Sequence, residues 1–462
     1  MRIKYLQLQC VLITVFLALT TTTALGQKMF SPGALKEDLQ FYRTQLEQNQ
    51  PNLYLYTSKE VMDNFFDSLN ASIDKPLDET AFYGIITLTS QKVKDGHTLI
   101  LPGRTYTAFH NANSRFMPFQ IGIFENQLYI KMNCTASKLI EDGTVIDSIN
   151  GMAAKDILYN LCNRQVRDGN NLSYCLWILN NYFREYYSFI FGHPDSFYIA
   201  FTQGQRRYYI RAAALPKDSI YYYRQKNYPA FHFDKKSFEG LTLQFDNTKE
   251  TAILSIKDFH NDVLRKNYHQ NFKTVINNFF DSIFLHKTEH LIIDLRNNQG
   301  GDIENGVHLL SYLVNKPFKV INSYACIENN AVADCNGASL GFHKPEKKVF
   351  EGDMYVLING GSFSNSAIVS SCLKEYTKAI FAGTESGGNP NVLSGNAKDF
   401  ELPNTKIMVE IPSKRFVMTS MEKNTGEGLK PDYFILNDIH DNMLQKDVPL
   451  ATVLELIEKK SK

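Results

Sequence analysis

The sequence predicts an α/β core that is preceded by a helical region and a small β-rich module. Three observations support this fold class. Apolar residues recur at helical spacing between residues 33 and 94. Short runs typical of strands, separated by turn residues, follow from residue 98 to about 215. From about residue 240, strand-like and helix-like runs alternate, which is the pattern of parallel strands joined by helices.

The length and composition allow a large core and exclude some classes of partner. The chain has 462 residues, of which 44% are hydrophobic and 13% are aromatic, so we expect two or three domains with sizeable cores. The formal net charge is +1. A charge this close to zero gives no electrostatic basis for binding nucleic acid or an anionic membrane surface.

Residues 1–26 resemble a secretory signal peptide. Arg2 and Lys4 supply a basic start, residues 11–19 form an apolar run too short to span a bilayer, and Ala24-Leu-Gly26 resembles a cleavage site. We therefore expect an exported protein, periplasmic or secreted, without a stable membrane span after cleavage. The alternative is an N-terminal anchor that is not cleaved.

Residues 27–104 are predicted to form an N-terminal helical region. Apolar residues at helical spacing predict a first helix, which Pro51 separates from a second. A third predicted helix, residues 79–93, runs into Asp95-Gly-His97-Thr98. A histidine on such a loop can reach a cleft and act as a general base near neutral pH. The alternative is an ordinary structural histidine.

Residues 105–215 are predicted to form the β-rich module. Strand patterns cover residues 119–124, 127–131 and 143–151, and the last of these ends in an Asn-Gly turn signal. A short helix is expected at residues 154–161. A module of this kind can bind an extended peptide by adding it as a strand.

Residues 216–462 are predicted to form the α/β core, with mostly parallel strands. The first three predicted strands are each followed by a helix-like run, as in repeated βα units. The predicted strands are residues 251–256, 291–295, 354–358 and 380–383, and the predicted helices are residues 268–285, 303–314 and 366–376.

Ser364 lies between a predicted strand and the helix that follows it. This position places a hydroxyl at the carboxyl edge of a parallel sheet, where α/β proteins bind ligands. The first N–H groups of the next helix have no partner within the helix and can bind an oxyanion, and Gly360-Gly361 lets a substrate approach. The alternative is that Ser364 and Asn365 only cap the helix.

A second loop of this type follows the preceding strand. It contains Asn297-Asn-Gln-Gly300-Gly301, and Asp302 begins the next helix. A glycine N–H here can supply a second donor to an oxyanion. The alternative is a plain turn between a strand and a helix, for which Gly and Asn are the expected residues.

The cysteines indicate no metal site. Six remain after signal cleavage, and they form neither a CxxC motif nor the spacing of a zinc site. In an exported protein, Cys326 can pair with Cys335 and Cys162 with Cys175. Buried free thiols are the alternative for both pairs.

Taken together and in this order, the motifs resemble the S41 family of serine peptidases, the group of tail-specific or C-terminal processing proteases and tricorn-core proteases. The resemblance extends over about residues 33–440. The motifs that carry it are Asp95-Gly-His97-Thr98, Gly143-Thr-Val-Ile-Asp-Ser-Ile-Asn-Gly151, Leu291-Ile-Ile-Asp-Leu-Arg-Asn-Asn-Gln-Gly-Gly301, Ser362-Phe-Ser364-Asn365, Gly383-Thr-Glu-Ser-Gly-Gly388 and Gly428-Leu-Lys-Pro-Asp432.

The resemblance implies a fold and a set of roles. Residues 216–462 would be a crotonase-like (ClpP/crotonase) catalytic core, and residues 105–215 a PDZ-like module. Ser364 would be the nucleophile and His97 the base, because glycine and asparagine stand where a related branch has its lysine. The predicted oxyanion hole consists of the N–H groups of Asn365 and of Gly300 or Gly301. No metal or cofactor is implied.

The chain departs from the family pattern at three positions. Gly96 stands where the tricorn-like branch has a serine, Ala367 where an acidic residue is common, and Thr425 where a glutamate is usual. Glu422 and Glu427 are nearby in the sequence, and we expect Glu422 to orient the base.

The predicted function is that of an exported serine-type peptidase acting on protein or peptide substrates. One alternative is a catalytically inactive relative that binds a peptide or an apolar ligand. Another is a scaffold that binds peptides through the β-rich module alone.

Overall fold

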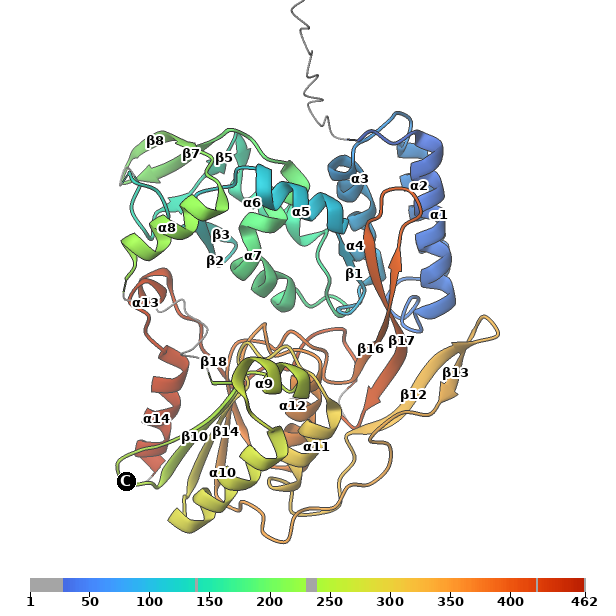
Figure 1. Cartoon of the computed structure of the whole chain (residues 1–462). Coiled ribbons are helices and arrows are strands. Elements are labelled where there is room, and N and C mark those ends of the chain that lie inside the picture. The colour runs from blue at the N-terminus through green and yellow to red at the C-terminus, as the bar shows by residue number, and fades with distance from the viewer. Residues whose placement is uncertain (1–27, 138–139, 230–238, 421–422, 461–462) are drawn as a thin grey trace, which may run out of the picture.

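The structure is a computed structural model, and it describes residues 28–137, 140–229, 239–420 and 423–460. The predicted signal peptide lies outside these ranges. The N-terminal helices and the middle module lie side by side, above the α/β core in the view of Figure 1. Within the described ranges, no helix combines the length and apolar character needed to cross a membrane.

The N-terminal region consists mainly of helices, as predicted. A serine or aspartate side chain caps each of the first three helices and accepts a hydrogen bond from a backbone N–H of the first turn. The expected third helix is interrupted by a 3-10 turn. The helices are α1 (Pro32–Asn49), α2 (Lys59–Ser72), α3 (Glu79–Ile86) and α4 (Ser90–Val93).

Among its described residues, the middle module holds two small antiparallel sheets and four helices. The predicted strands at residues 119–124 and 127–131 and the helix at residues 154–161 are confirmed. The strand predicted at residues 143–151 is instead two short strands, β4 and β5, which belong to different sheets. The long helix α7 and the hairpin β7–β8 were not predicted. One sheet has the order β2-β3-β4 and the other β6-β5-β7-β8. The elements are α5 (Arg104–Asn113), β2 (Phe119–Phe124), β3 (Gln127–Asn133), β4 (Val145–Ile146), β5 (Ser148–Ile149), β6 (Met152–Ala153), α6 (Ala154–Cys162), α7 (Ser173–Phe191), β7 (Ser196–Gln203), β8 (Arg206–Ala213) and α8 (Lys217–Asn227).

The core sheet confirms the predicted α/β class. Its order is β18-β15-β14-β11-β10-β9, and every pair except β10–β9 is parallel. Apolar clusters cover both faces, so β11 is buried throughout. The elements are β9 (Leu241–Phe245), β10 (Thr251–Ile256), α9 (Asn261–Tyr268), α10 (Phe272–His286), β11 (His290–Asp294), α11 (Ile303–Ser311), β14 (Asp353–Ile358), α12 (Asn365–Tyr376), β15 (Ile380–Gly383), β18 (Tyr433–Phe434), α13 (Ile439–Met443) and α14 (Val448–Lys460).

A second sheet, which was not predicted, joins the core to the N-terminal helices. Its strand β1 comes from the N-terminal region and pairs with β17, whose other neighbours are β12 and β16. Apolar residues of the β16–β17 hairpin complete the core of the helical region, and Figure 1 shows the hairpin reaching up to those helices. The strands are β1 (Leu99–Leu101), β12 (Ile321–Glu328), β13 (Ala331–Cys335), β16 (Val392–Glu401) and β17 (Met408–Met418).

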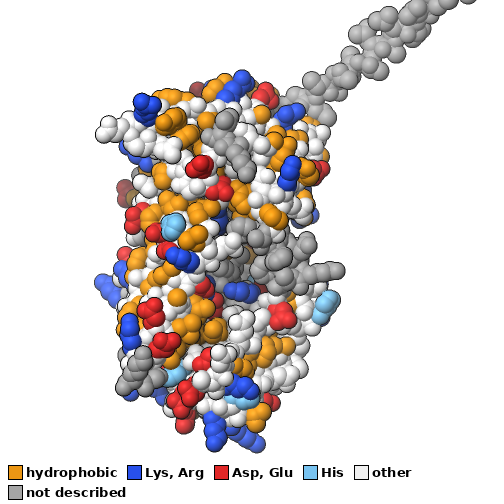
Figure 2. Space-filling view, turned by 90° about the vertical axis from the view of Figure 1, so that its left-hand side faces the viewer, with side chains coloured by type: hydrophobic (Ala, Val, Ile, Leu, Met, Phe, Trp, Pro, Cys, Tyr) orange, Lys and Arg blue, Asp and Glu red, His pale blue; other side chains and the backbone are white. Residues whose placement is uncertain are grey.

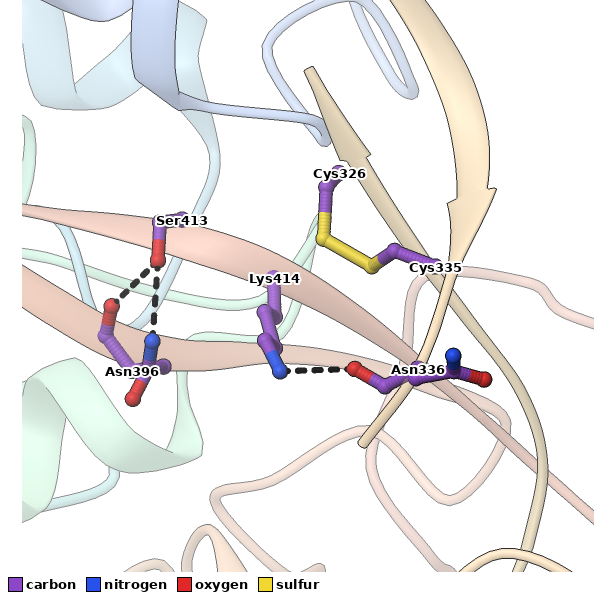
Figure 3. The surroundings of a disulfide bond; sticks show 6 residues. All are labelled: Cys326, Cys335, Asn336, Asn396, Ser413 and Lys414. Atoms are coloured by element: carbon purple, nitrogen blue, oxygen red, sulfur yellow. Dashed lines mark hydrogen bonds between the residues drawn. A yellow bond between two sulfur atoms is a disulfide. The ribbon is translucent and has the colours of Figure 1, made fainter. Parts of the chain in front are cut away.

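The cysteines follow one of the two predicted pairings. Cys326 and Cys335 form a disulfide across the β12–β13 hairpin, with a Cα–Cα distance of 5.9 Å (Figure 3). The other proposed pairing is wrong, because Cys162 and Cys175 are buried free thiols. Cys175 Sγ instead donates to the Cys162 carbonyl oxygen at 3.8 Å.

Candidate active site

The turn between β14 and α12 holds Ser364 in an unusual backbone conformation. Its φ is 54° and its ψ is −119°, a combination that non-glycine residues rarely adopt and that costs about 1–3 kcal/mol. Ser364 occupies the N-cap position of α12, but its side chain accepts no hydrogen bond from the described residues of the helix. Ser364 is partly exposed, whereas its neighbours on both sides are buried. The capping alternative is therefore wrong, and a ligand can reach Ser364.

The loop after β11 packs directly against this turn. A Cβ atom at Gly300 would lie 2.6 Å from Ser364 Cβ and 2.7 Å from the Asn365 nitrogen, so only glycine fits there. The Phe363 N–H donates to the Asn298 carbonyl oxygen at 3.0 Å and ties the two loops together. The structure thus brings the predicted residues Gly300, Asn365 and Ser364 together.

The backbone N–H groups beside Ser364 differ in their partners. The Gly300 N–H donates to Asn298 Oδ1 at 2.8 Å and is therefore engaged within the loop. Among the described residues, the N–H groups of Gly301 and Asn365 have no hydrogen-bond partner. Of the predicted oxyanion donors, these two remain able to bind a ligand oxygen.

His97 lies on the loop after α4, and the buried carboxylate of Asp95 shapes this loop. Asp95 Oδ1 accepts from the His97 N–H at 3.0 Å and from Thr98 Oγ1 at 3.0 Å. Burial lowers the pKa of His97 below its ordinary value, and the charge of Asp95 acts in the opposite direction. The imidazole is therefore neutral near pH 7 and can accept a proton.

A stack of aromatic rings connects His97 to the serine turn. The His97 ring lies on Phe363 with centroids 4.5 Å apart, and Phe363 stacks on Tyr174 at 4.0 Å. Tyr174 in turn stacks on Trp177 at 5.9 Å. The stack therefore brings side chains of the N-terminal region, the core and helix α7 into contact beside Ser364. No sequence pattern assigned these aromatic residues to the site, because phenylalanine and tyrosine at such positions are equally typical of a core.

Base and nucleophile are close in the fold but are not hydrogen-bonded. No hydrogen bond between described residues joins Ser364 to His97, and Nδ1 of His97 is buried without a partner among them. The predicted orienting residue, Glu422, lies outside the described residues. Glu427, the other candidate, forms an ion pair with Lys430 at 2.6 Å. Catalytic hydrogen bonds are often long or open in the absence of substrate.

Asp168 is a further site residue that was not predicted from the sequence. It is buried on the loop between α6 and α7, where it accepts from the Gly96 N–H at 2.8 Å and from the Asn389 N–H at 3.2 Å. Burial, and then the charge of Asp95, raise the pKa of Asp168. Its carboxylate joins the histidine loop to the loop after β15. No local pattern in the sequence marks this role.

Tight packing accounts for two of the departures from the family pattern. A Cβ atom at Gly96 would lie 2.6 Å from the Phe363 ring, and one at Gly388 would lie 2.6 Å from Ala367 Cβ. A serine at position 96 would therefore clash with Phe363, and Ala367 is buried with its Cβ atom close to Gly388. Thr425 is exposed.

The fold and the site together define a class: an α/β protein whose strand–serine–helix turn lies beside unpaired backbone N–H groups, as nucleophilic attack by serine requires. Comparison with known proteins names the family. Residues 250–435 match the model of peptidase family S41. Over that segment, this chain is similar to peptidase family S41.

Relatives in sequence agree with this assignment over a limited length. A probable CtpA-like serine protease of Staphylococcus saprophyticus is 25% identical over 142 residues, which are 31% of this chain and 26% of the relative. The protein of the same description from Staphylococcus aureus is 26% identical over 149 residues, or 31% of this chain and 27% of the relative. The match thus spans about a quarter of the length of these relatives.

Solved structures resemble the chain over nearly its whole length. Mature CPAF complexed with lactacystin has a TM-score of 0.66 and 12% sequence identity, covering 93% of this chain and 98% of that chain. Mature CPAF has a TM-score of 0.63 and 12% identity, covering 89% of this chain and 94% of that chain. At this identity the likeness shows a shared mixed α/β fold.

Proposed function

We propose that this protein is an exported serine-type peptidase that hydrolyses peptide bonds of protein or peptide substrates. One observation carries the proposal: Ser364 is held in a strained, accessible conformation at the start of a helix it does not cap. Strain of this kind clusters at functional sites. The match of residues 250–435 to peptidase family S41 and the CtpA-like serine protease relatives support the same activity.

In the proposed mechanism, Ser364 Oγ forms a bond to the carbonyl carbon of the substrate while His97 accepts the hydroxyl proton. His97 then gives this proton to the leaving amine as the C–N bond breaks. Water, deprotonated by the same imidazole, hydrolyses the acyl-enzyme and releases the acid product. The pKa of His97, lowered by burial, keeps the imidazole in the basic form that the first step requires.

The developing oxyanion would bind to the N–H groups of Asn365 and Gly301. The Gly300 N–H is less suited, because Asn298 Oδ1 already accepts from it at 2.8 Å. Each oxyanion donor typically contributes about 3 kcal/mol to transition-state stabilisation. Glu422 is the proposed partner of His97 Nδ1, an atom that is buried and unpaired among the described residues.

The domain roles and export belong to the same proposal. Residues 105–215 would be a PDZ-like module, against which α8 packs, and the remainder of residues 216–462 a crotonase-like core. Removal of residues 1–26 as a signal peptide would release a periplasmic or secreted protein. The Cys326–Cys335 disulfide supports export, because structural disulfides persist mainly in oxidising compartments.

The proposal is tested by incubating the purified mature protein with casein and identifying new peptide termini by mass spectrometry. Ser364→Ala should reduce cleavage at least about thousandfold. Ser370→Ala is the matched control, since this serine lies in the same helix, is buried and has no hydrogen-bond partner among the described residues. Cleavage that persists in Ser364→Ala would overturn the assignment of the nucleophile.

A further inference from the structure

The first strand of the middle module has no edge free for a peptide. Strand β2 pairs with β3 on one side, and helix α7 covers its other side. Asn180 Oδ1 accepts from the Ile123 N–H at 3.2 Å, and the Arg184 guanidinium donates to the carbonyl oxygens of Met117 at 2.7 Å and Phe119 at 3.2 Å. These side chains occupy backbone groups that an added strand would need. Strand addition to this module therefore requires a different edge.

Strand β8 offers such an edge. It is the last strand of its sheet, and among the described strands it pairs only with β7. Figure 1 places it at an outer corner of the molecule. Between the described residues, no backbone hydrogen bond reaches the outer side of residues 206–211. An open edge of this length is a template for another extended chain.

The hydrogen bonds of β7 determine which β8 residues face outward. The Asn150 N–H donates to the Tyr198 carbonyl oxygen and the Asp147 N–H to that of Ala200, both at 2.8 Å, so these β7 groups face β5. Their antiparallel partners in β8 are Arg211 and Tyr209. Because bonding alternates along an antiparallel pair, the N–H and C=O groups of these two residues, and of Arg207, point away from β7.

The outward residues give this edge a basic and aromatic character. Arg207, Tyr209 and Arg211 alternate with their neighbours and lie on one face of the strand. Tyr209 is 71% exposed. The Arg207 guanidinium lies 5.4 Å from the Tyr209 ring, which holds both side chains along the strand. Viewed from this side, basic and hydrophobic side chains lie together near the upper end of the molecule in Figure 2.

Few acidic groups neutralise these charges. Arg207 Nε lies 3.7 Å from Asp147 Oδ2, and both side chains are partly exposed. Arg211 Nε donates to the hydroxyl of Ser196 at 3.1 Å, and this hydroxyl carries no charge that could neutralise the guanidinium. Arg206 adds a third positive charge, and β8 contains no acidic residue. The edge therefore carries unbalanced positive charge beside unpaired backbone groups.

The geometry points to β8 as a docking site for an acidic segment of a protein in extended conformation, which adds to the sheet as a further strand. Backbone hydrogen bonds would come from Arg207, Tyr209 and Arg211. Selectivity would come from carboxylates placed opposite Arg207 and Arg211. This site lies in the middle module, away from Ser364, and goes beyond the proposed peptidase activity. Its test measures binding and does not depend on hydrolysis.

A second copy of this chain fits the edge poorly. Pairing β8 with itself would place arginines opposite or diagonal to arginines, and like charges across strands are destabilising. Positive charge on an edge strand also serves to prevent self-association. Positive charge is compatible with both roles of the β8 edge, prevention of self-association and docking of an acidic segment. Measuring whether an acidic strand binds to β8 distinguishes the two roles.

The test uses the full mature chain carrying Ser364→Ala, so that no probe is cleaved. The probe is a fluorescein-labelled peptide of alternating glutamate and threonine, about ten residues long to match an extended strand. Fluorescence anisotropy should show binding that weakens with salt. Arg207→Gln with Arg211→Gln should weaken it about tenfold or more. Lys75→Gln with Lys347→Gln, two exposed lysines outside the module, removes the same charge and should leave binding unchanged.

Backbone methylation of the probe separates strand addition from simple charge attraction. In a β-strand, alternate N–H groups point to opposite edges. N-methylation of all glutamates or of all threonines should therefore weaken binding about fivefold or more in one case only. Equal binding of both methylated peptides would overturn strand addition. Failure of the unmethylated peptide to bind would also overturn the proposal and leave edge protection as the role of the arginines.

Discussion

The two sides of the candidate site are built in different ways. The serine side is local, because Ser364 and Gly300 lie on loops that follow two adjacent parallel strands, β14 and β11. The histidine side is assembled from distant segments. The loop of His97 is held by Asp168 from the middle module, which also binds Asn389 of the core. Local turn chemistry thus positions the nucleophile, whereas tertiary packing positions the base.

This difference implies that the two sides respond differently to mutation. A change at the serine removes a reacting group but leaves the fold intact. A change beside the histidine disturbs contacts between regions and should affect activity and stability together. The following predictions test this contrast, from the largest expected effect on turnover to the smallest.

Gly96→Ala should have the largest effect on the histidine side. The added Cβ atom would lie 2.6 Å from the ring of Phe363, which is held between the rings of His97 and Tyr174. We expect the free energy of unfolding to fall by about 1–3 kcal/mol and turnover to fall at least about hundredfold. Chemical denaturation measures the free energy of unfolding, and peptide hydrolysis measures turnover.

Gly84→Ala is the matched control for this substitution. A Cβ atom at Gly84 would meet no other atom within 4 Å, and the residue lies in α3, where alanine is preferred to glycine. We expect unchanged turnover and equal or higher stability. Full activity of Gly96→Ala would show that His97 does not depend on this packing.

Asp168→Asn should reduce turnover less than Gly96→Ala does. An amide can accept from only one of the two N–H groups that Asp168 now binds, and its NH2 group would face the other. We expect stability to fall by about 1–3 kcal/mol. We also expect kcat to fall more than KM rises, because the substitution displaces the base rather than the substrate. Asp74→Asn, at an exposed position, should change neither. A change in KM alone would argue against a positioning role.

The pH dependence of turnover should report the environment of His97. Burial lowers the pKa of His97 below its ordinary value of 6.5. A general base must be neutral, so activity is lost as pH falls through this pKa. We therefore expect kcat/KM to be more than half-maximal at pH 6.5, the ordinary pKa of histidine, and to decline in more acidic solution. A midpoint above 6.5 would contradict the burial of the base.

Removing the disulfide should have the smallest effect on turnover. Cys326 and Cys335 are 9 residues apart in the β12–β13 hairpin, which contributes no residue to the candidate site. Cys326→Ala with Cys335→Ala should lower the free energy of unfolding by about 2–3 kcal/mol and leave turnover unchanged. Treatment of the wild type with a reductant should give the same result. A loss of activity in either experiment would link this hairpin to the site.

The sequence predicted the serine side better than the histidine side, for a physical reason. Buried strands followed by Gly, Asn and Ser have clear local patterns, and these predicted β11, β14 and the turn at Ser364. The contacts of Asp168 and Phe363 link residues far apart in the chain. The spacing of apolar residues along the sequence does not reveal such contacts. The sheet that contains β16 and β17 was missed for the same reason. Helix α7 lies in a polar and aromatic stretch without regular spacing.

The central claim is that His97, placed by packing, activates Ser364, placed by its turn. A fluorophosphonate probe tests this claim most directly, by intact-mass measurement of the labelling rate of the wild type, Ser364→Ala and His97→Ala. We predict one adduct on Ser364 in the wild type, none in Ser364→Ala, and labelling slowed at least about hundredfold in His97→Ala. An adduct on another residue, no labelling of the wild type, or equal rates in the wild type and His97→Ala would contradict the claim.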